Sequence, residues 1–422
     1  MSEPPVQPIN SSNESTSTRP RPRRGFRRII AIVAAALIVL VLIVVAVFFV
    51  VVQRAQPAQP GSFYALPTPL PNKPPGTIIR SEPLTDVPAW ARAWKVLYMS
   101  TSYTGNPTAV SGMIIVSSHP PSGTHHVIAF ANGTVGVASN CAASIQGTKA
   151  FGALHGLRDF LAAGDVVAAT DYQGLGTAGP HPYLVGKSEA ESVLDSVRAA
   201  HNFQQAHAGT AFAVLGPSQG GQAALFTGQL AGAYAPELKL VGVAASAPPT
   251  DLKELLRLNI EGIFGKVLSA FALDSWSQVY GHNLDQVFKP VARPIVHRLV
   301  RYCIHNAKQS LAVIPLAQLL KIGYLKGLPW QVEPWKTIVE QNTPGQTPIP
   351  APVLISQGGA DLLVHPPITA AFAKHLCSVG ERVVYRVYPG VPHDAGAASS
   401  PDAVRWIADR FAGKPAPSTC AT

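Results

Sequence analysis

The stretch AVLGPSQGGQAAL, Ala213 to Leu225, holds the pattern that decides the fold. An apolar run ends at Gly216, Ser218 stands between glycines, and a run of small residues follows. A Gly-x-Ser-x-Gly turn between a strand and a helix forms a nucleophile elbow, because small residues at positions 216 and 220 permit a tight turn. With 35 glycines in 422 residues, chance produces this motif in roughly a fifth to a quarter of such chains. A plain glycine-rich loop is therefore the alternative.

Short apolar strands alternate with helix-length segments around this motif. Helices are expected at residues 156–164, 188–207 and 218–231, the second opened by Ser188 and Glu191 as a capping box. Strands are expected at residues 94–102, 109–118, 125–133, 165–176, 211–216, 238–247, 350–358 and 382–390. Continuously apolar strands that alternate with helices indicate the α/β class, with a mostly parallel central sheet of about eight strands flanked by helices.

Residues 248–345 interrupt this alternation. They contain several apolar helical patterns and no further strand pattern, which predicts a helical insertion between two strands. Open α/β sheets bind ligands at the carboxyl ends of their strands, so we expect the insertion to form a cap over that edge. A separate domain is the alternative. The core then comprises residues 77–247 and 346–422.

Two further polar residues follow strands in the order that an elbow of this kind predicts. Asp361 comes after the strand at 350–358, and His393 comes after the strand at 382–390. A serine nucleophile needs a base, and the base needs a carboxylate that orients it. Ser218, Asp361 and His393 each follow a separate strand in the order serine, acid, histidine, which favours an elbow over a simple loop.

Other titratable residues compete for these roles. His365 lies only four residues from Asp361, and His375 lies within a predicted helix, where a surface or packing role is more common. Asp394 neighbours His393 and is a candidate helix cap. Asp171 ends a strand and is interpreted as a residue that holds a loop.

A tetrahedral intermediate needs hydrogen-bond donors for its oxyanion. The first candidate is the backbone N–H of Gln219, which follows the serine. The second candidate donor is Gly133 or Thr134, in the loop at residues 131–144 after the third predicted strand. A simple glycine turn is the alternative interpretation of this loop.

The N-terminus carries a candidate membrane anchor. Ile29 to Val52 is a run of 24 apolar residues, and as a helix it is roughly 36 Å long, enough for a ~30 Å hydrocarbon core. Six arginines precede it within residues 1–28, a segment expected to be a disordered cytoplasmic tail, and this bias places the rest of the chain outside the cytoplasm. Secretion after signal cleavage is the alternative. Residues 53–76 are Pro-rich and predict an extended linker.

Composition excludes several classes of function. The formal net charge is +10, but +4 of it lies in residues 1–28 and the remainder forms no basic stripe, which argues against a nucleic-acid partner. The four cysteines follow the apolar run and lack the spacing of a metal site. In an oxidising compartment they predict two disulfides, in any of three pairings. We expect no metal and no cofactor. The cysteines are Cys141, Cys303, Cys377 and Cys420.

At these residues the chain resembles the secretory lipase family, α/β-hydrolases of fungi and bacteria that cleave lipid esters. The resemblance rests on the stretches NGTVGVASNCAAS, TDYQGLGTAGPHPYL, GPSQGGQAAL, SQGGADLLV and VPHDAG. It implies an α/β-hydrolase fold with a helical cap at residues 248–345 and a triad of Ser218, Asp361 and His393. The anchor and the linker lie outside the resemblance.

The resemblance also implies the disulfides Cys141–Cys303 and Cys377–Cys420. It further implies a triacylglycerol lipase-like serine esterase that hydrolyses hydrophobic carboxylic esters through an acyl-enzyme. Two other functions stay open, an acyltransferase with the same triad and a catalytically inactive envelope protein. Four cap residues are either an acyl-contacting face or ordinary helix core, namely Phe264, Leu268, Phe271 and Leu273.

Overall fold

The computed structural model describes Met1 and residues 24–53, 57–321 and 323–420. It divides into two units, Met1–Arg54 and Ala55–Thr422, and each is described by itself. The first unit contains helix α1 (Arg24–Gln53). Within it, Arg28–Val47 is long and apolar enough to cross a bilayer, a property that an N-terminal signal sequence shares.

The start of α1 corrects one prediction. Residues 2–23 of the predicted disordered tail lie outside the described residues. For residues 24–28 the prediction of disorder is wrong, because α1 begins at Arg24 rather than at Ile29. Arginine is a good helix former, so the helix continues past the apolar run.

The second unit is built on one sheet, to which its described residues contribute nine strands in the order β1-β2-β3-β5-β4-β6-β7-β8-β9. The first three strands pair antiparallel, and β3 is antiparallel to β5, whereas the pairs from β5 through β9 are parallel. The strands are β1 (Ile78–Pro83), β2 (Ala91–Thr101), β3 (Pro107–Ser117), β4 (His125–Ala131), β5 (Val166–Thr170), β6 (Ala208–Pro217), β7 (Lys239–Ser246), β8 (Val353–Gly358) and β9 (Val383–Tyr388).

Strand β1 is the one that the sequence pattern missed. Its sequence IIRSEP is charged and only half-buried, and it pairs on one side alone, at the edge of the sheet. An edge strand of this kind lacks the continuous apolar run by which the other strands were predicted.

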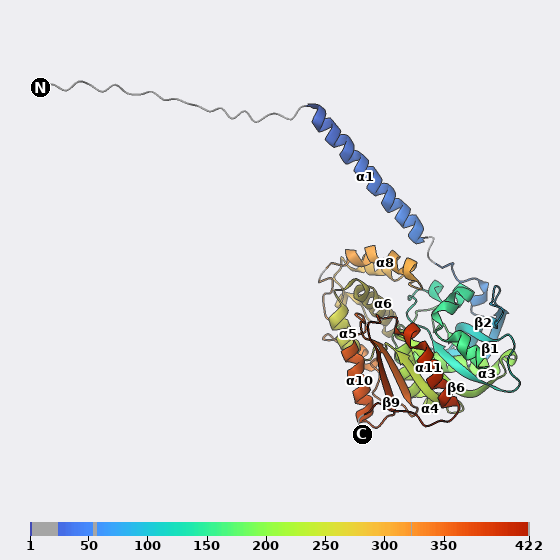
Figure 1. The fold of residues 1–422 in the computed structure, drawn as a ribbon. Helices are drawn as coiled ribbons and strands as arrows, with labels where there is room; N and C mark the ends of the chain where they lie inside the picture. The colour runs from blue at the N-terminus through green and yellow to red at the C-terminus, as the bar shows by residue number, and fades with distance from the viewer. Residues whose placement is uncertain (2–23, 54–56, 322, 421–422) are drawn as a thin grey trace. The chain divides into compact units, whose positions relative to one another are not determined.

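Helices cover both faces of the sheet (Figure 1). Alternate residues of β6 point to opposite faces: Phe212 and Val214 pack with the helices of one layer, and Ala213 and Leu215 pack with those of the other. The first layer contains α3 (Gly186–Asn202), α4 (Gln219–Tyr234) and α10 (Pro366–Ser378). The second contains α2 (Leu157–Ala162) and α11 (Ala395–Phe411).

The predicted capping box of α3 is wrong. The helix begins at Gly186, so Ser188 and Glu191 lie inside it rather than at its first turn. The Ser188 hydroxyl instead donates to the side chain of Gln173.

The described residues between β7 and β8, where the helical insertion is expected, form five α-helices. Figure 1 shows α5, α6 and α8 next to one another above the sheet. These helices have a hydrophobic core of their own, in which Phe271, Trp276 and Trp335 are buried. The helices are α5 (Leu252–Asn259), α6 (Ile263–Tyr280), α7 (Arg293–Leu299), α8 (Ala307–Leu319) and α9 (Trp335–Gln341). We refer to residues 248–345 as the cap.

The Pro-rich segment is not a free linker over its whole length, which corrects the prediction for residues 53–76. Tyr64 is buried, and its hydroxyl lies 3.0 Å from the Ser144 hydroxyl. The Arg80 guanidinium donates to the carbonyl oxygens of Ser62 and Phe63, and the Gly76 N–H donates to the Met99 carbonyl. Proline composition favours extended backbone but does not prevent it from packing on a domain.

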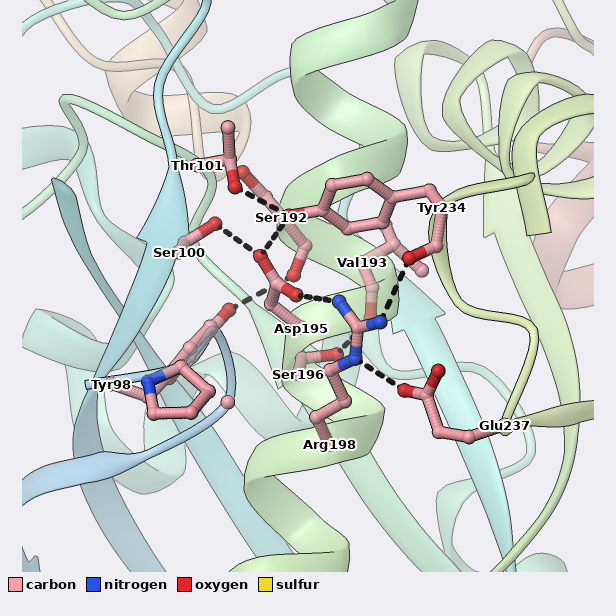
Figure 2. Close-up of polar contacts among 12 residues, drawn as sticks. Tyr98, Ser100, Thr101, Ser192, Val193, Asp195, Ser196, Arg198, Tyr234 and Glu237 are labelled. Carbon is pink, nitrogen blue, oxygen red and sulfur yellow. Dashed lines mark hydrogen bonds and ion pairs between the residues drawn. The ribbon is translucent and has the colours of Figure 1, made fainter. Parts of the chain in front are cut away.

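A buried carboxylate joins α3 to the sheet and to α4 (Figure 2). Asp195 accepts hydrogen bonds from Ser100 Oγ at 2.7 Å, from Tyr234 Oη at 2.9 Å and from Arg198 Nη1 at 2.8 Å. Burial raises the pKa of Asp195, and these three donors oppose that shift. Arg198 also binds Glu237 through Nε. Side-chain exposure is 0% for Asp195 and 51% for Glu237, so one guanidinium has a buried and an exposed partner.

We expect Asp195→Ala to lower the free energy of unfolding by about 3 kcal/mol or more, because it leaves a half-buried guanidinium and two hydroxyls without their acceptor. The matched control Glu237→Ala removes the exposed partner of the same guanidinium and should cost about 1 kcal/mol or less. Urea unfolding of the full chain measures the free energy of unfolding of both variants. Equal losses in the two variants would contradict this account of the buried carboxylate.

Candidate active site

Ser218 lies at a sharp turn between β6 and α4. Its backbone has φ 53° and ψ −121°, a left-handed conformation that costs a non-glycine residue on the order of 1–3 kcal/mol. The Ser218 N–H donates to the Ser246 carbonyl at the end of β7, at 2.8 Å, and thereby holds the turn against the neighbouring strand. The turn leaves the side chain half-buried at the carboxyl edge of the sheet.

The two motif glycines have a steric function in this turn. A Cβ atom on Gly216 would lie 2.2 Å from the Gly220 carbonyl oxygen, and one on Gly220 would lie 2.0 Å from the Ala131 carbonyl oxygen. Both contacts are with backbone atoms, which cannot rotate away. The start of α4 therefore packs directly on the ends of β4 and β6, and only hydrogen atoms fit between them.

His393 links the serine to a carboxylate. Its Nε2 lies 2.9 Å from Ser218 Oγ, and its Nδ1 lies 2.9 Å from Asp361 Oδ2. Because a carboxylate only accepts, Nδ1 carries the proton, and Nε2 is left to accept the serine proton. The loops after β8 and β9 thus bring both side chains to the elbow.

The surroundings of Asp361 keep it charged. Its side chain is fully buried, and it accepts the backbone N–H groups of Leu363 and Val364 at 2.8 and 2.9 Å as well as the Gln357 amide at 3.1 Å. Burial raises the pKa of the carboxyl, but the hydrogen bonds from His393, Leu363 and Val364 outweigh it, so the pKa of Asp361 lies below its ordinary value. The carboxylate is thus available to orient His393 and to stabilise its protonated form.

The competing residues lie elsewhere. His365 is the residue before α10 and lines an open groove of about 730 Å³ that does not have Ser218 among its lining residues. His375 is exposed, with Nε2 3.2 Å from the Gly345 carbonyl oxygen. Asp394 precedes α11 and lies 3.5 Å from His155.

Asp171 has a structural environment. It is buried and accepts hydrogen bonds from the Ser111 hydroxyl at 2.7 Å and the Ser144 N–H at 3.0 Å. These bonds tie β3 and the segment after Cys141 to the end of β5. Among the described residues there is no group of three or more His, Cys, Asp or Glu side chains suited to a metal ion.

The two segments predicted to supply oxyanion donors both lie next to the elbow. Gln219 is the first residue of α4, and N–H groups of a first helical turn have no partner within the helix. The loop after β4 brings Gly133 against Pro217, and a Cβ on Gly133 would lie 3.3 Å from the Pro217 carbonyl oxygen. The Thr134 hydroxyl lies 3.0 Å from the Tyr183 hydroxyl.

The loop after β4 is fixed from several directions. The Asn132 amide donates to the Thr170 carbonyl at 2.7 Å, and the Tyr172 hydroxyl donates to the Asn132 carbonyl at 2.8 Å. The disulfide Cys141–Cys303 attaches the same loop to the cap, and Cys377–Cys420 attaches the C-terminal segment to α10. This is the pairing that the family resemblance implies.

The side chains that contact the Gln219 amide were not predicted from the sequence. The Gln219 amide donates to Glu189 Oε1 at 2.7 Å and lies 3.3 Å from His181 Nε2. Burial raises the pKa of Glu189 to about 8, against hydrogen bonds from Gln219 and Leu184 that lower it, and burial lowers the pKa of His181 to about 4. No fixed spacing relates positions 181, 189 and 219, so sequence pattern could not have found this contact.

A narrow apolar cavity of about 70 Å³ opens beside Ser218, between the core and cap helices α5 and α6. Leu268 lines it, as the acyl-contacting alternative requires. Phe271 and Leu273 are instead buried in the cap core, and Phe264 is exposed, so that alternative is wrong for these three residues. The other lining residues are mainly apolar and include Leu252, Leu255, Leu256, Trp276 and Val364.

Comparison with known proteins identifies the family. The family model for secretory lipases matches residues 139–419, which is more than half of the chain. The chain belongs to the secretory lipase family. A solved structure of Candida antarctica lipase A superposes with a TM-score of 0.72 at 19% identity, covering 86% of this chain and 88% of the other, which shows a shared α/β-hydrolase fold.

Two curated members of the family are similar over most of their length. A probable inactive lipase of Mycobacterium tuberculosis is 27% identical, over 84% of this chain and 82% of that protein. A secreted triacylglycerol lipase of Malassezia globosa is 26% identical, over 85% of this chain and 80% of that protein. Membership of the family and the shared fold indicate a hydrolase of the lipase and esterase kind.

Gly220→Ala should reduce ester hydrolysis by about 100-fold or more, because the added methyl group must displace the backbone that aligns Ser218 and the N–H of Gln219. Gly232→Ala is the matched control on the same helix, since a Cβ there meets no atom within 4 Å. It should leave activity unchanged and add about 0.5–1 kcal/mol of stability through helix propensity. Steady-state kinetics and thermal unfolding test both, and an active Gly220→Ala enzyme would contradict the steric argument.

Proposed function

We propose that this chain is a membrane-anchored, extracytoplasmic serine esterase or lipase that hydrolyses hydrophobic carboxylic esters through an acyl-enzyme. One observation carries the proposal: His393 makes 2.9 Å contacts with both Ser218 and Asp361, beside an apolar cavity. That arrangement combines a nucleophile, a general base and an orienting carboxylate with a place for an acyl chain.

The geometry supports a two-step acyl transfer to water. His393 Nε2 takes the Ser218 proton as Oγ attacks the ester carbonyl, and Asp361 stabilises the resulting imidazolium. The protonated His393 then donates its proton to the departing alcohol, which leaves the acyl group on Ser218. Water deprotonated by His393 attacks that acyl group, and the released Oγ recovers its proton.

Two donors are proposed to stabilise the negative oxygen of each tetrahedral intermediate. The Gln219 N–H lies at the amino end of α4, where the helix dipole also favours negative charge. Gly133 or Thr134 supplies the second donor from the loop after β4. Gly216 and Gly220 belong to the same proposal, because they let this donor and Ser218 lie close together.

The apolar cavity supports a hydrophobic acyl group as the substrate. Its lining is mainly apolar and its volume is about 70 Å³, which suits a short hydrophobic acyl group. We therefore expect faster hydrolysis of short-chain esters than of long-chain esters.

The N-terminal helix supports the proposed location. We propose that α1 remains uncleaved as a single-pass anchor, with the arginine-rich tail in the cytoplasm and the catalytic unit outside, because the apolar run exceeds the ~7–15 residues usual in signal peptides. Under the alternative, the chain is secreted after cleavage. In either case the two disulfides fit an oxidising compartment.

Labelling with a fluorophosphonate tests the function directly. We expect covalent labelling of the purified full chain and loss of labelling in Ser218→Ala. In Asp361→Asn we expect kcat to drop by roughly 10⁴-fold, because the amide keeps the geometry but favours the wrong tautomer of His393. An unlabelled wild-type chain would make it an inactive member, as one relative is named. Labelling that persists in Ser218→Ala would refute the assigned nucleophile. Addition of alcohol acceptors then separates hydrolysis from acyl transfer.

Chain-length preference tests the role of the cavity. Leu268→Ala should raise the ratio of kcat/KM for octanoate over acetate esters by about 10-fold, because it removes three carbon atoms from the cavity wall. Leu319→Ala is the matched control, since Leu319 is an exposed residue at the end of cap helix α8. The ratio compares two substrates on one enzyme, so a partly unfolded preparation does not alter it. Equal ratios in both variants would remove Leu268 from the acyl site.

A further inference from the structure

The side chain of Gln219 is clamped by two acceptors. Its amide donates to Glu189 Oε1 at 2.7 Å and points its nitrogen at His181 Nε2, 3.3 Å away. His181 Nδ1 lies 2.9 Å from the Gln173 carbonyl oxygen, which can only accept, so the proton is on Nδ1 and Nε2 accepts from the amide. All of these residues are buried. The clamp fixes the side chain of the residue whose backbone N–H is the first proposed oxyanion donor.

The same short segment reaches the second proposed donor. Tyr183 Oη lies 3.0 Å from Thr134 Oγ1, in the loop after β4. The Leu184 N–H donates to the Glu189 carboxyl oxygen that also holds Gln219, at 2.9 Å, which joins both contacts into one unit. We call residues 181–189 the strut. It contacts the side chains of Gln219 and Thr134, which belong to the two proposed donor segments.

Cap helix α6 holds the strut by three hydrogen bonds. The Ser275 hydroxyl donates to the His181 carbonyl at 2.6 Å and accepts the Tyr183 N–H at 2.8 Å. The Trp276 indole N–H donates to the Tyr183 carbonyl at 2.9 Å. These bonds are buried, so the loss of a partner that leaves a polar group unsatisfied costs about 1–3 kcal/mol. The Tyr183 N–H also donates to the His181 carbonyl at 2.8 Å, so without Ser275 it keeps one of its two acceptors.

From this chain of contacts we infer that the strut couples the position of cap helix α6 to the geometry of the oxyanion hole, with Ser275 and Glu189 as positioning residues. The inference deepens the proposed function and rests on it. Tyr183, Leu184 and Trp276 also line the acyl cavity, so a bound acyl chain touches the strut and the helix that holds it. Acyl chain, cap and oxyanion donors are therefore linked through one segment.

The test uses Ser275→Ala with Ser277→Ala as the matched control. Ser277 is on the same helix, and its hydroxyl donates to the His282 carbonyl within the cap, away from the strut. We expect Ser275→Ala to lower kcat for a short-chain ester by about 10-fold with KM within about twofold, because an oxyanion donor acts mainly in the transition state. Ser277→Ala should keep wild-type kinetics.

Affinity for an alkylboronic acid gives a second measurement. The boronate adduct on a serine carries a tetrahedral, negatively charged centre, so its Kd depends on the oxyanion donors. It should weaken by about 10-fold in Ser275→Ala and stay unchanged in Ser277→Ala. A purely structural role of Ser275 would lower the melting temperature and leave both kcat and this Kd unchanged.

Two substitutions of Glu189 provide a further test within the same segment. Glu189→Gln keeps an oxygen that accepts from Gln219 and Leu184, and a neutral amide resembles the neutral acid that burial favours, so activity should stay within about threefold of wild type. Glu189→Leu removes the acceptor and should lower kcat by about 10-fold or more. Equal activity in the Gln and Leu variants would overturn the positioning role.

The outcomes separate the two proposals. A wild-type chain that neither reacts with a fluorophosphonate nor hydrolyses esters contradicts the proposed function. A wild-type chain that is active, with Ser275→Ala and Ser277→Ala indistinguishable in kcat and in boronate affinity, contradicts the strut alone. An increase in KM without a change in kcat in Ser275→Ala also contradicts it, because that result places the effect on ground-state binding.

Discussion

The structure depends on one close approach of two backbones. The first turn of α4 packs on the ends of β4 and β6 with no room for a side chain at Gly216 or Gly220. This contact fixes where the helix begins and forces Ser218 into a left-handed conformation. The strain at Ser218 is offset by the sheet around it, since the five β6 residues from Phe212 to Gly216 are buried. A rigid core therefore holds a single strained residue at the edge where α/β sheets bind their ligands.

The cap is joined to this edge rather than resting loosely over it. Three attachments are independent of one another: the Cys141–Cys303 disulfide, the bond from Asn259 to the Leu363 carbonyl, and the hydrogen bonds from α6 to residues 181–183. The first reaches the loop after β4, the second the loop that carries Asp361, and the third the segment behind Gln219. The loop after β4 and the loop that carries Asp361 are thus connected directly to the cap, and Gln219 is connected to it through residues 181–189.

The fold and the three side chains at the elbow could be predicted from the sequence because each side chain follows a strand with a recognisable apolar pattern. That pattern is buried at the end of β6 and throughout β8, and it is partly exposed in β9. It could not reach features that depend on contacts between distant, unpatterned positions. Strand β1 is half-exposed, so nothing in its composition separates it from a loop. The packing of Tyr64 on Ser144 and the clamp of Glu189 on Gln219 join residues with no periodic relation, and only the folded chain brings them together.

The disulfide ring divides the proposed triad. Cys141 and Cys303 are 162 positions apart, and the closed ring between them contains Ser218 and the parallel strands β5, β6 and β7. Asp361 and His393 lie outside it, on the segment that follows the cap. The nucleophile and Gln219 thus lie inside this ring, whereas Gly133 and Thr134 come just before it. His393 lies in a second ring, closed by Cys377–Cys420, and Asp361 lies on the segment between the two rings. Each member of the proposed triad therefore belongs to a different covalent segment of the chain, and the parallel pairing of β7 with β8 and of β8 with β9 brings the three segments together.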